Sequence, residues 1–371
     1  MLIIRSRLRL PFPQQKLLNR IMETKILKAL GHMPEDETVI NLAKNIIENG
    51  GLVAIPTETV YGLAGNALDP SASKKIYEAK GRPSDNPLIV HICDIKALDR
   101  ITADIPDCAF ILAEKFWPGP LTMIFKKSSA VPDETSGGLD TVAVRMPSNP
   151  IAAEFIGACG GYIAAPSANS SGRPSCTTAQ HVKEDLGGKI PLIIDGGEVG
   201  IGLESTIIDL TGEIPCLLRP GFVGLEALRH ILKDVSTDPA VFGNAGTAPP
   251  KAPGMKYRHY APRGTLTIIS GEKKAVSSYI NERTKEAADK GIKAAVLCCR
   301  ENVGLYDRSL VYDAGSIYNE EEIAHDLFSV LRNFDRDNVE VIYSEEFNTP
   351  NMGLAIMNRL KKAAGNRIVH V

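Results

Sequence analysis

The sequence lacks the cysteine arrangements that hold a zinc ion or staple a small secreted domain. Its seven cysteines, at positions 93, 108, 159, 176, 216, 298 and 299, form no C-x-x-C pair and no Cys/His cluster with zinc spacing. An odd and scattered set of cysteines favours reduced thiols, and therefore a cytoplasmic protein. Apolar runs also stay short of the roughly 18–20 residues that cross a bilayer, so we expect no membrane span.

An excess of charge of one sign is missing as well. The 371 residues carry a formal net charge of −2, and only 6% of them are aromatic. A near-neutral chain has no overall field that attracts nucleic acid, so an anion site has to be a local pocket. The composition, 44% hydrophobic and 23% charged, is that of a globular protein, and the length suffices for two domains.

Several motifs of well-known enzyme classes are absent. There is no G-x-x-x-x-G-K-[ST] phosphate loop and no G-x-S-x-G nucleophile turn. With no evident covalent nucleophile, catalysis would depend on positioning and on charge neutralisation.

Composition and periodicity divide the chain into four parts. Residues 1–21 are basic, contain no acidic residue and are predicted to be a disordered extension, with Met22 as the functional start. Residues 22–242 alternate strand and helix patterns without a regular period, which predicts a mixed α/β sheet. Residues 243–263 are rich in Gly and Pro and read as a linker or lid, and 264–371 restart as a smaller Rossmann-like α/β domain. That domain has no G-x-G-x-x-G turn after its first strand, so we expect no dinucleotide site there.

The clearest helices are predicted at 36–49, 70–80, 107–116, 272–290, 319–333 and 352–364. Strands are predicted at 52–56, 87–93, 121–126, 141–146, 161–165, 191–195, 205–210 and 215–219. The second domain adds strands at 265–270, 294–299, 310–314, 339–344 and 367–371.

Two cations are restrained at the end of the helix predicted over 70–80. Lys80 and Arg82 flank Gly81, and Pro83 biases Arg82 toward an extended backbone. Cations at a helix C-terminus can simply complement the helix dipole. The constrained path that follows, through Asn86 to His91, favours a binding role instead.

Polar residues follow two of the predicted strands directly. The segment PTETVYGL, 56–63, contains Thr57, Glu58 and Thr59, and AAPSANSSGRPS, 164–175, is rich in hydroxyl and amide side chains. Such side chains around a glycine can turn donors toward phosphate oxygens, although the second segment could also be a surface loop. Strand ends are favoured ligand positions in α/β sheets, which indicates a site.

Prolines restrain three arginines, Arg82, Arg145 and Arg219, each followed by a proline within two residues. A planar guanidinium suits phosphate and carboxylate recognition, although any one of the three could serve an internal salt bridge. With the segment GLEST at 202–206, they predict a pocket for several negative charges, such as a triphosphate carries.

These motifs together resemble a known family. IPTETVYGL, KGRP-x-x-NPLIVH, FWPGPLT, AVRMP, APSAN-x-SG-x-PS, GLESTI and LRPG are similar to the L-threonylcarbamoyladenylate synthases, the YrdC-like family. PGMKYRHYAP and the following α/β domain resemble its longer, two-domain branch, and the likeness covers residues 22–371. It implies a twisted, open mixed sheet with a cationic concavity. It also implies formation of threonylcarbamoyl-AMP and pyrophosphate from L-threonine, bicarbonate and ATP, for threonylcarbamoyladenosine in tRNAs that read ANN codons.

The resemblance also implies roles for individual residues. Its Lys-x-Arg and Ser-x-Asn signatures, expected to be catalytic, fall on Lys80, Arg82, Ser167 and Asn169. It implies threonine contacts at Thr59, His91, Arg145, Ala165 and Ser205. ATP contacts are implied at Arg82, Asn86, Thr141, Ser167, Ser175 and Arg219, with Tyr257 or His259 closing over the nucleotide. Mg²⁺ would arrive with ATP, without protein ligands, and a tRNA threonylcarbamoyltransferase would take the product.

Two other interpretations remain at this stage. The cationic concavity could hold RNA, but the near-neutral charge and the lack of a basic-aromatic stripe speak against it, and direct tRNA binding stays open. A hydrogenase-maturation carbamoyltransferase carries a similar domain, but also zinc-binding C-x-x-C motifs that this chain lacks.

Overall fold

The computed structural model describes residues 23–31, 33–242, 251–253, 259–306 and 310–371. The predicted extension at 1–21, Tyr257 and most of the predicted linker therefore lie outside the described residues. Among the described residues, every helix is too short or too polar to cross a membrane.

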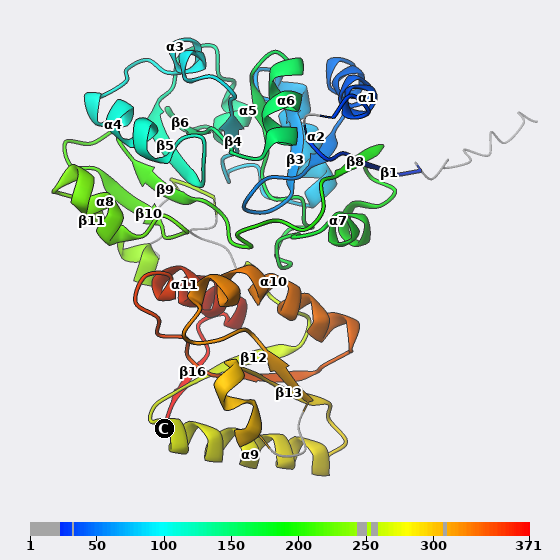
Figure 1. Ribbon diagram of the computed structural model, residues 1–371, viewed down its shortest axis with the longest axis vertical. Coiled ribbons are helices and arrows are strands. Elements are labelled where there is room, and N and C mark those ends of the chain that lie inside the picture. Colours follow the sequence, from blue (N-terminus) through cyan, green and yellow to red (C-terminus); the bar gives the residue numbers. More distant parts are fainter. Residues whose placement is uncertain (1–22, 32, 243–250, 254–258, 307–309) are drawn as a thin grey trace, which may run out of the picture.

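The first domain is built on one eleven-stranded mixed sheet, ordered β1-β8-β2-β3-β7-β4-β6-β5-β9-β10-β11 (Figure 1). Its strands are β1 Lys25–Lys28, β2 Val53–Ile55, β3 Gly62–Asn66, β4 Ile89–His91, β5 Leu121–Lys126, β6 Thr141–Arg145, β7 Ile163–Ala164, β8 Leu192–Asp195, β9 Thr206–Asp209, β10 Cys216–Arg219 and β11 Ser236–Thr237. Its α-helices are α1 Asp36–Glu48, α2 Pro70–Lys80, α3 Leu98–Ile101, α4 Asp107–Phe116, α5 Asp133–Ser136, α6 Pro150–Ala158, α7 Ala179–Leu186 and α8 Leu225–Leu232. Short 3-10 turns lie at Ile95–Ala97 and Pro239–Phe242.

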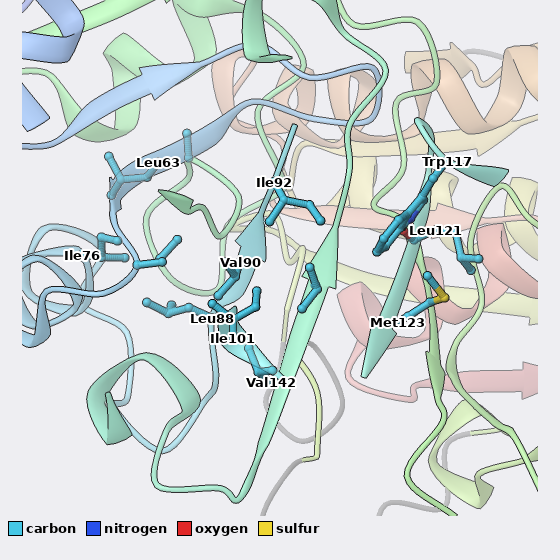
Figure 2. Close-up of a cluster of buried hydrophobic side chains, with 14 of the residues drawn as sticks. Leu63, Ile76, Leu88, Val90, Ile92, Ile101, Trp117, Leu121, Met123 and Val142 are labelled. Carbon is cyan, nitrogen blue, oxygen red and sulfur yellow. The ribbon is translucent and has the colours of Figure 1, made fainter. Parts of the chain in front are cut away.

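The sheet is mixed because it contains both parallel and antiparallel neighbours. The β2·β3 and β5·β6 pairs are antiparallel, whereas β4·β6 and β5·β9 are parallel. An apolar core packs on it, with Leu63, Val90, Leu121 and Met123 pointing from the strands in Figure 2. The predicted mixed α/β sheet is thus confirmed.

Local sequence signals explain where α2 begins and ends. The Asp69 carboxylate accepts a hydrogen bond from Ser71 N at 2.8 Å, and Pro70 occupies the first turn, where no backbone donor is needed. Gly81 ends the helix in the left-handed region, with φ +62°, which a residue without Cβ adopts at little cost. This stop places Lys80 and Arg82 on opposite sides of a tight turn.

The second domain is a five-stranded, all-parallel sheet ordered β14-β13-β15-β12-β16. It contains β12 Thr265–Ser270, β13 Ala294–Cys298, β14 Leu310–Asp313, β15 Val341–Ser344, β16 Ile368–His370, α9 Lys273–Asp289, α10 Glu320–Arg336, α11 Gly353–Ala364 and a 3-10 turn at Arg300–Leu305. Figure 1 shows α10 and α11 facing the first domain, with α9 on the far side of the small sheet. The predicted smaller α/β domain is confirmed.

The two domains share apolar packing. Val60 and Leu203, which belong to the first domain, are buried in the same cluster as Phe328 and Leu360 of the second. Both belong to segments that carry predicted site residues. The second domain therefore supports the walls of the candidate site directly.

Candidate active site

One pocket gathers most of the predicted site residues. It lies where β2, β4, β6, β9 and β10 meet their connecting segments, close to the second domain. Of the predicted site residues, those that line it are Thr59, Arg82, His91, Arg145, Ala165, Ser167, Asn169, Ser205, Arg219 and His259. Three lining residues are arginines and one, Glu204, is an acid, so the pocket suits an anion.

Arg145, at the end of β6, is fixed by contacts on three sides. Its Nη1 donates to Thr59 Oγ1 at 2.8 Å, and its Nη2 lies 2.8 Å from Glu58 Oε1. Its Nε donates a longer bond to Gly119 O. Burial acts to raise the pKa of Glu58, but the charge of Arg145 together with hydrogen bonds from Arg145 and the backbone holds that pKa below the usual value. The guanidinium is therefore oriented before any ligand binds.

The turn that carries Glu58 and Thr59 is held by a hydroxyl. Thr57 Oγ1 donates to Val60 O at 2.6 Å and accepts from the backbone N–H of Val60 at 3.2 Å. It also lies 3.0 Å from Thr59 Oγ1. Thr57 thus closes the connection between β2 and β3 and aims Thr59 at Arg145.

His91, at the end of β4, is a neutral imidazole. Its Nδ1 lies 3.1 Å from Ile89 O, and since a carbonyl only accepts, Nδ1 carries the proton. Burial and the nearby charge of Arg145 lower the pKa of His91 to about 3. Nε2 is left as the acceptor of the ring, which lines the pocket.

Lys80 supports the pocket from behind the Ser-x-Asn segment. Its Nζ donates to the backbone carbonyls of Ser167 and Asn169, and it does not line the pocket itself. Burial, with a smaller effect of Arg82, lowers the pKa of Lys80 to about 7. The structure thus places the Lys-x-Arg signature against the Ser-x-Asn signature, joined through the lysine.

Arg82 lines the pocket, and its guanidinium is held by backbone carbonyls of the segment that follows it. Its Nε and Nη2 donate to Asn86 O at 3.3 and 3.2 Å, and Nη2 also donates to Pro87 O at 3.0 Å. Asn86 is buried beneath this guanidinium and is not among the lining residues. The predicted ATP contact at Asn86 stays a prediction.

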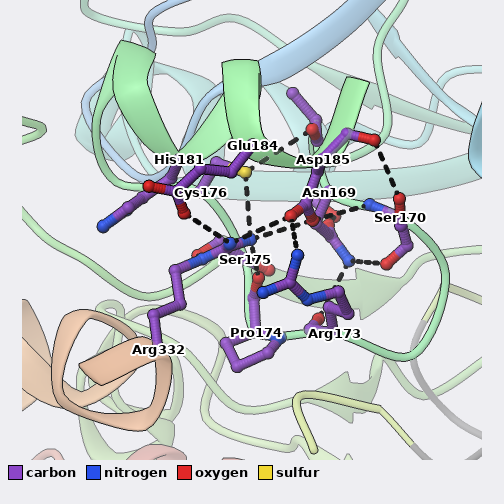
Figure 3. A network of polar contacts seen from close by, with 12 residues as sticks. Asn169, Ser170, Arg173, Pro174, Ser175, Cys176, His181, Glu184, Asp185 and Arg332 are labelled. Carbon is purple, nitrogen blue, oxygen red and sulfur yellow. Dashed lines mark hydrogen bonds and ion pairs between the residues drawn. The ribbon is translucent and has the colours of Figure 1, made fainter. Parts of the chain in front are cut away.

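The Ser-x-Asn segment is tied down from several sides. Ser167 Oγ donates to Asn169 Oδ1, and Asn169 Nδ2 donates to the carbonyls of Ser170 and Arg173 at 2.8 and 2.9 Å. Figure 3 shows the network that continues from this segment to Asp185 of α7. Ser170 N donates to the Asp185 carboxylate at 2.9 Å. The segment is a rigid wall of the pocket.

The network also crosses to the second domain. Arg332 of α10 donates from Nη1 and Nη2 to both carboxylate oxygens of Asp185 at 3.1 Å, and Arg173 pairs with the same carboxylate (Figure 3). Arg332 further donates to the carbonyls of Pro174 and Ser175. No motif at Arg332 indicated this role, because the contact joins residues 147 positions apart.

Arg219 and Ser205 form the remaining wall. Arg219 Nε donates to Ser205 O at 3.0 Å, and its Nη2 donates to Ser205 Oγ at 3.1 Å. Burial lowers the pKa of Arg219 to about 10, so it remains a cation at neutral pH. Nη1 donates to Pro253 O at 3.3 Å, so a described part of the predicted linker touches the pocket.

Two more predicted ATP residues, Ser175 and Thr141, do not line the pocket. Ser175 is fully buried and donates its hydroxyl to Glu204 Oε1. Thr141 begins β6, whereas Arg145 ends the same strand. Their assignments stay predictions.

Tyr260 is one of several lining residues that the sequence reasoning missed, with Val60, Tyr61, Ile89, Pro166 and Pro253. Tyr260, beside His259, is 4% exposed, and its ring lies 5.0 Å from that of Phe328 in α10. The aromatic residues of the segment PGMKYRHYAP indicated that a ring lies near the site. Because they alternate with basic residues, the sequence did not indicate which ring faces the pocket. Burial lowers the pKa of His259 to about 3, so this ring is neutral too.

In the part of the chain that the structure describes, no group of three or more His, Cys, Asp or Glu side chains could hold a metal ion. The carboxylates of Glu58 and Glu204 are each paired with an arginine. The pocket is thus organised around cationic and hydroxyl donors.

The fold and this pocket define a two-domain α/β protein with an arginine-rich anion site. A family profile described as "Telomere recombination" (Sua5/YciO/YrdC) matches residues 45–221, and one described as "Threonylcarbamoyl-AMP synthase, C-terminal domain" matches residues 223–365. The chain belongs to the threonylcarbamoyl-AMP synthase family, which confirms the resemblance and its two-domain branch.

The similarity to known proteins covers nearly the whole chain. The threonylcarbamoyl-AMP synthase of Pyrococcus abyssi is 50% identical over 337 residues, covering 91% of this chain and 97% of its own. That of Bacillus subtilis is 43% identical over 351 residues, covering 94% and 100%. A crystal structure of P. abyssi Sua5 complexed with L-threonine has a TM-score of 0.88 and 48% identity, covering 94% of this chain and 99% of that one.

Proposed function

We propose that this chain joins L-threonine, bicarbonate and ATP into threonylcarbamoyl-AMP and releases pyrophosphate. The observation that carries the proposal is the convergence of Arg82, Arg145 and Arg219 on one pocket with Ser167 and Asn169. Such a site can bring together reactants that are each negatively charged. The family membership points to the same reaction.

The chemistry needs two steps. The threonine nitrogen adds to the carbon of bicarbonate, and loss of water leaves a carbamate. A carbamate oxygen then attacks the α-phosphorus of ATP, a new O–P bond forms, and the bond to the β-phosphate breaks to release pyrophosphate. Both attacking and attacked groups are anionic, so fixed positive charge lowers the barrier most.

We assign the threonine end of the pocket to Arg145 and its neighbours. A guanidinium binds a carboxylate with two parallel hydrogen bonds, and Arg145 is already oriented by Glu58 and Thr59. His91 Nε2 can accept a hydrogen bond from the threonine hydroxyl. Ala165 and Ser205 complete this end.

We assign the phosphate end to Arg82 and Arg219, with hydroxyl and amide groups between them. Lys80 would hold the Ser167–Asn169 segment in place from behind the pocket wall. Asn86, Thr141 and Ser175 remain assigned to ATP, with Tyr257 or His259 over the nucleotide.

Mg²⁺ fits this pocket as an ion that arrives with ATP. The nearest carboxylates are engaged by arginines, so the described residues offer no complete set of oxygen ligands. When bound to the phosphates, Mg²⁺ would supply charge neutralisation of the leaving pyrophosphate. The protein's own arginines would orient the phosphate chain.

The product is a labile mixed anhydride, so it should pass quickly to an acceptor. We propose that a tRNA threonylcarbamoyltransferase uses it to modify adenosine in tRNAs reading ANN codons. All seven cysteines are free thiols, which fits a cytoplasmic location.

The test is pyrophosphate release from purified protein given ATP, Mg²⁺, bicarbonate and one amino acid at a time. We expect release only with threonine and bicarbonate together, and a product with the mass of threonylcarbamoyl-AMP. Arg82→Ala should abolish release, whereas Arg300→Ala, an exposed arginine of the second domain, should not. Release that is indifferent to threonine would overturn the proposal.

A further inference from the structure

We propose that Arg359, a residue of the second domain, is a positioning residue for the pocket in the first domain. It joins the three segments that carry Ser175, Ser205 and Arg219. This inference rests on the proposed function, because the three residues are assigned there to ATP and threonine. It gives the second domain a direct part in binding.

The side chain of Arg359 is fully buried and contacts the first domain through all three of its nitrogens. Nε donates to Glu204 Oε2 at 3.1 Å, and Nη2 donates to Glu204 O at 3.2 Å. Nη1 donates to Pro220 O. Glu204 precedes Ser205 and Pro220 follows Arg219, so one guanidinium fixes the backbone next to both residues.

The carboxylate of Glu204 extends this clamp to a third segment. Its Oε1 accepts a hydrogen bond from the hydroxyl of Ser175, and its Oε2 accepts one from Arg359 Nε. Burial acts to raise the pKa of Glu204, but Arg359, Arg219 and the hydrogen bonds from Ser175 and the backbone together lower it below the ordinary value. An ionised carboxylate between a serine and an arginine leaves Ser175 little freedom to rotate.

The second domain packs closely against the segment that carries Glu204. A Cβ added to Gly202 would lie 2.4 Å from the backbone of His325, so α10 sits directly on the Gly-Leu-Glu-Ser-Thr turn. Leu203, the next residue, is buried in the core of the second domain. The contacts of Arg359 thus lie in a close-packed interface.

The arrangement depends on the fork shape of the guanidinium as well as on its charge. A lysine at position 359 could neutralise Glu204, but its single nitrogen could not reach Glu204 Oε2, Glu204 O and Pro220 O in the same geometry. Substitution by lysine therefore separates the effect of the positive charge from the effect of the guanidinium's shape. Positioning predicts that the shape is needed even when the charge is kept.

The experiment compares Arg359→Lys with wild type and with Arg300→Lys, an exposed arginine that pairs with Asp313 and Glu322 inside the second domain. Steady-state pyrophosphate release gives kcat and the KM values for ATP and threonine, normalised to folded protein. ATP affinity is measured separately by calorimetry without threonine. We expect Arg359→Lys to lower kcat/KM for ATP by about 10- to 100-fold and Arg300→Lys to leave it unchanged.

A double variant covers the case in which Arg359→Lys fails to fold. Arg359→Met with Glu204→Gln removes both buried charges, so neither is left unpaired. Because Glu204 itself lines the pocket, positioning predicts weaker ATP binding in this variant than in Glu204→Gln alone. Wild-type kcat and KM per folded molecule, with only a lower melting temperature, would reduce Arg359 to a structural contact and overturn the inference.

The two proposals can fail separately. If wild-type protein releases no pyrophosphate with threonine and bicarbonate, the proposed function fails. The calorimetric comparison of ATP binding still tests Arg359 in that case, since it needs no reaction.

Discussion

Arg145 Nη2 and Glu58 Oε1 lie 2.8 Å apart, so the guanidinium assigned to the threonine carboxylate has an anionic partner before substrate binds. Their side chains are only 5% and 14% exposed, and an arginine this buried is costly to leave without an anion. In the proposed binding mode, the substrate carboxylate and Glu58 share one cation. In that mode, threonine binding depends on a residue outside the pocket lining.

Glu58→Gln should make the protein less stable but more responsive to threonine. Removing one partner of a buried pair costs about 3–5 kcal/mol, and an amide that keeps a hydrogen bond should lie at the lower end. A threonine carboxylate would then supply the missing anion. We expect a larger threonine-induced rise in melting temperature than in wild type, and an equal or smaller rise would contradict the shared-cation relationship.

The pH dependence of stability offers a second check on Glu58. Its folded pKa lies below the ordinary 4.5, so its pairing stabilises the fold above that value. This contribution is lost as the pH falls through the folded pKa. Wild type should therefore lose more stability than Glu58→Gln over that acidic range in denaturant titrations.

His91→Phe should weaken the discrimination of threonine from valine, which has a methyl group in place of the hydroxyl. Loss of one hydrogen bond of about 1.4 kcal/mol corresponds to a roughly tenfold fall in the ratio of kcat/KM values. Because the pKa of His91 is about 3, the wild-type ratio should be the same at pH 6 and pH 8. Competition assays at both pH values measure this, with exposed His230→Phe as control.

ATP binding should take up protons at pH 8. The pKa of Lys80 is lowered to about 7 by burial, so at pH 8 the amine is largely neutral in the free protein. Nearby phosphates favour the charged form and raise that pKa, which draws in a proton. Calorimetry in buffers of different ionisation enthalpy measures the number of protons.

Lys80→Met should bind ATP with less proton uptake than wild type. Some uptake should remain, because burial also lowers the pKa of Lys362, near Arg219, to about 7. Lys74→Met, on the exposed face of the same helix, is the matched control. Identical proton uptake in Lys80→Met and wild type would show that the Lys80 amine is not near the ATP phosphates.

Arg332→Met should destabilise the interface between the two domains. The Arg332 and Asp185 side chains are 3% and 0% exposed, and breaking such a pair costs about 3–5 kcal/mol. Arg173 still pairs with Asp185, which places the expected loss at the lower end. Thermal or denaturant unfolding measures it against Arg336→Met, whose side chain is 71% exposed.

A double-mutant cycle would test the same pair. Asp185→Asn combined with Arg332→Met should cost less than the sum of the two single changes, because each change already breaks the same contact. Strict additivity would show that the pair contributes nothing beyond the separate side chains.

Features set by neighbouring residues could be predicted from the sequence. Helix α2 begins and ends where Asp69, Pro70 and Gly81 indicate, because caps and turns depend on local geometry. Strand β3 was missed, since its glycines and alanine give no clear period. Helix α6 was missed although Asn149 and Pro150 carry an N-terminal signal.

The candidate site was predictable only in part for a related reason. The sequence indicated that Arg82, Arg145 and Arg219 belong to one anion pocket, because each stands at a restrained strand or helix end. It could not indicate that Lys80 points at the carbonyls of Ser167 and Asn169, 87 and 89 residues away. Nor could it indicate the partners of Arg332 and Arg359. Such contacts arise from the packing of whole domains.

Val60 and Leu203 are buried among side chains of the second domain. This packing couples ligand binding in the pocket to the stability of the second domain. Separating the two domains would expose this apolar surface beside the pocket, so closure of the interface and order of the pocket stabilise each other. By linkage, whatever tightens the pocket must also protect the distant small sheet. Amide exchange in β12 and β15 would therefore report on occupancy of a site that those strands never touch.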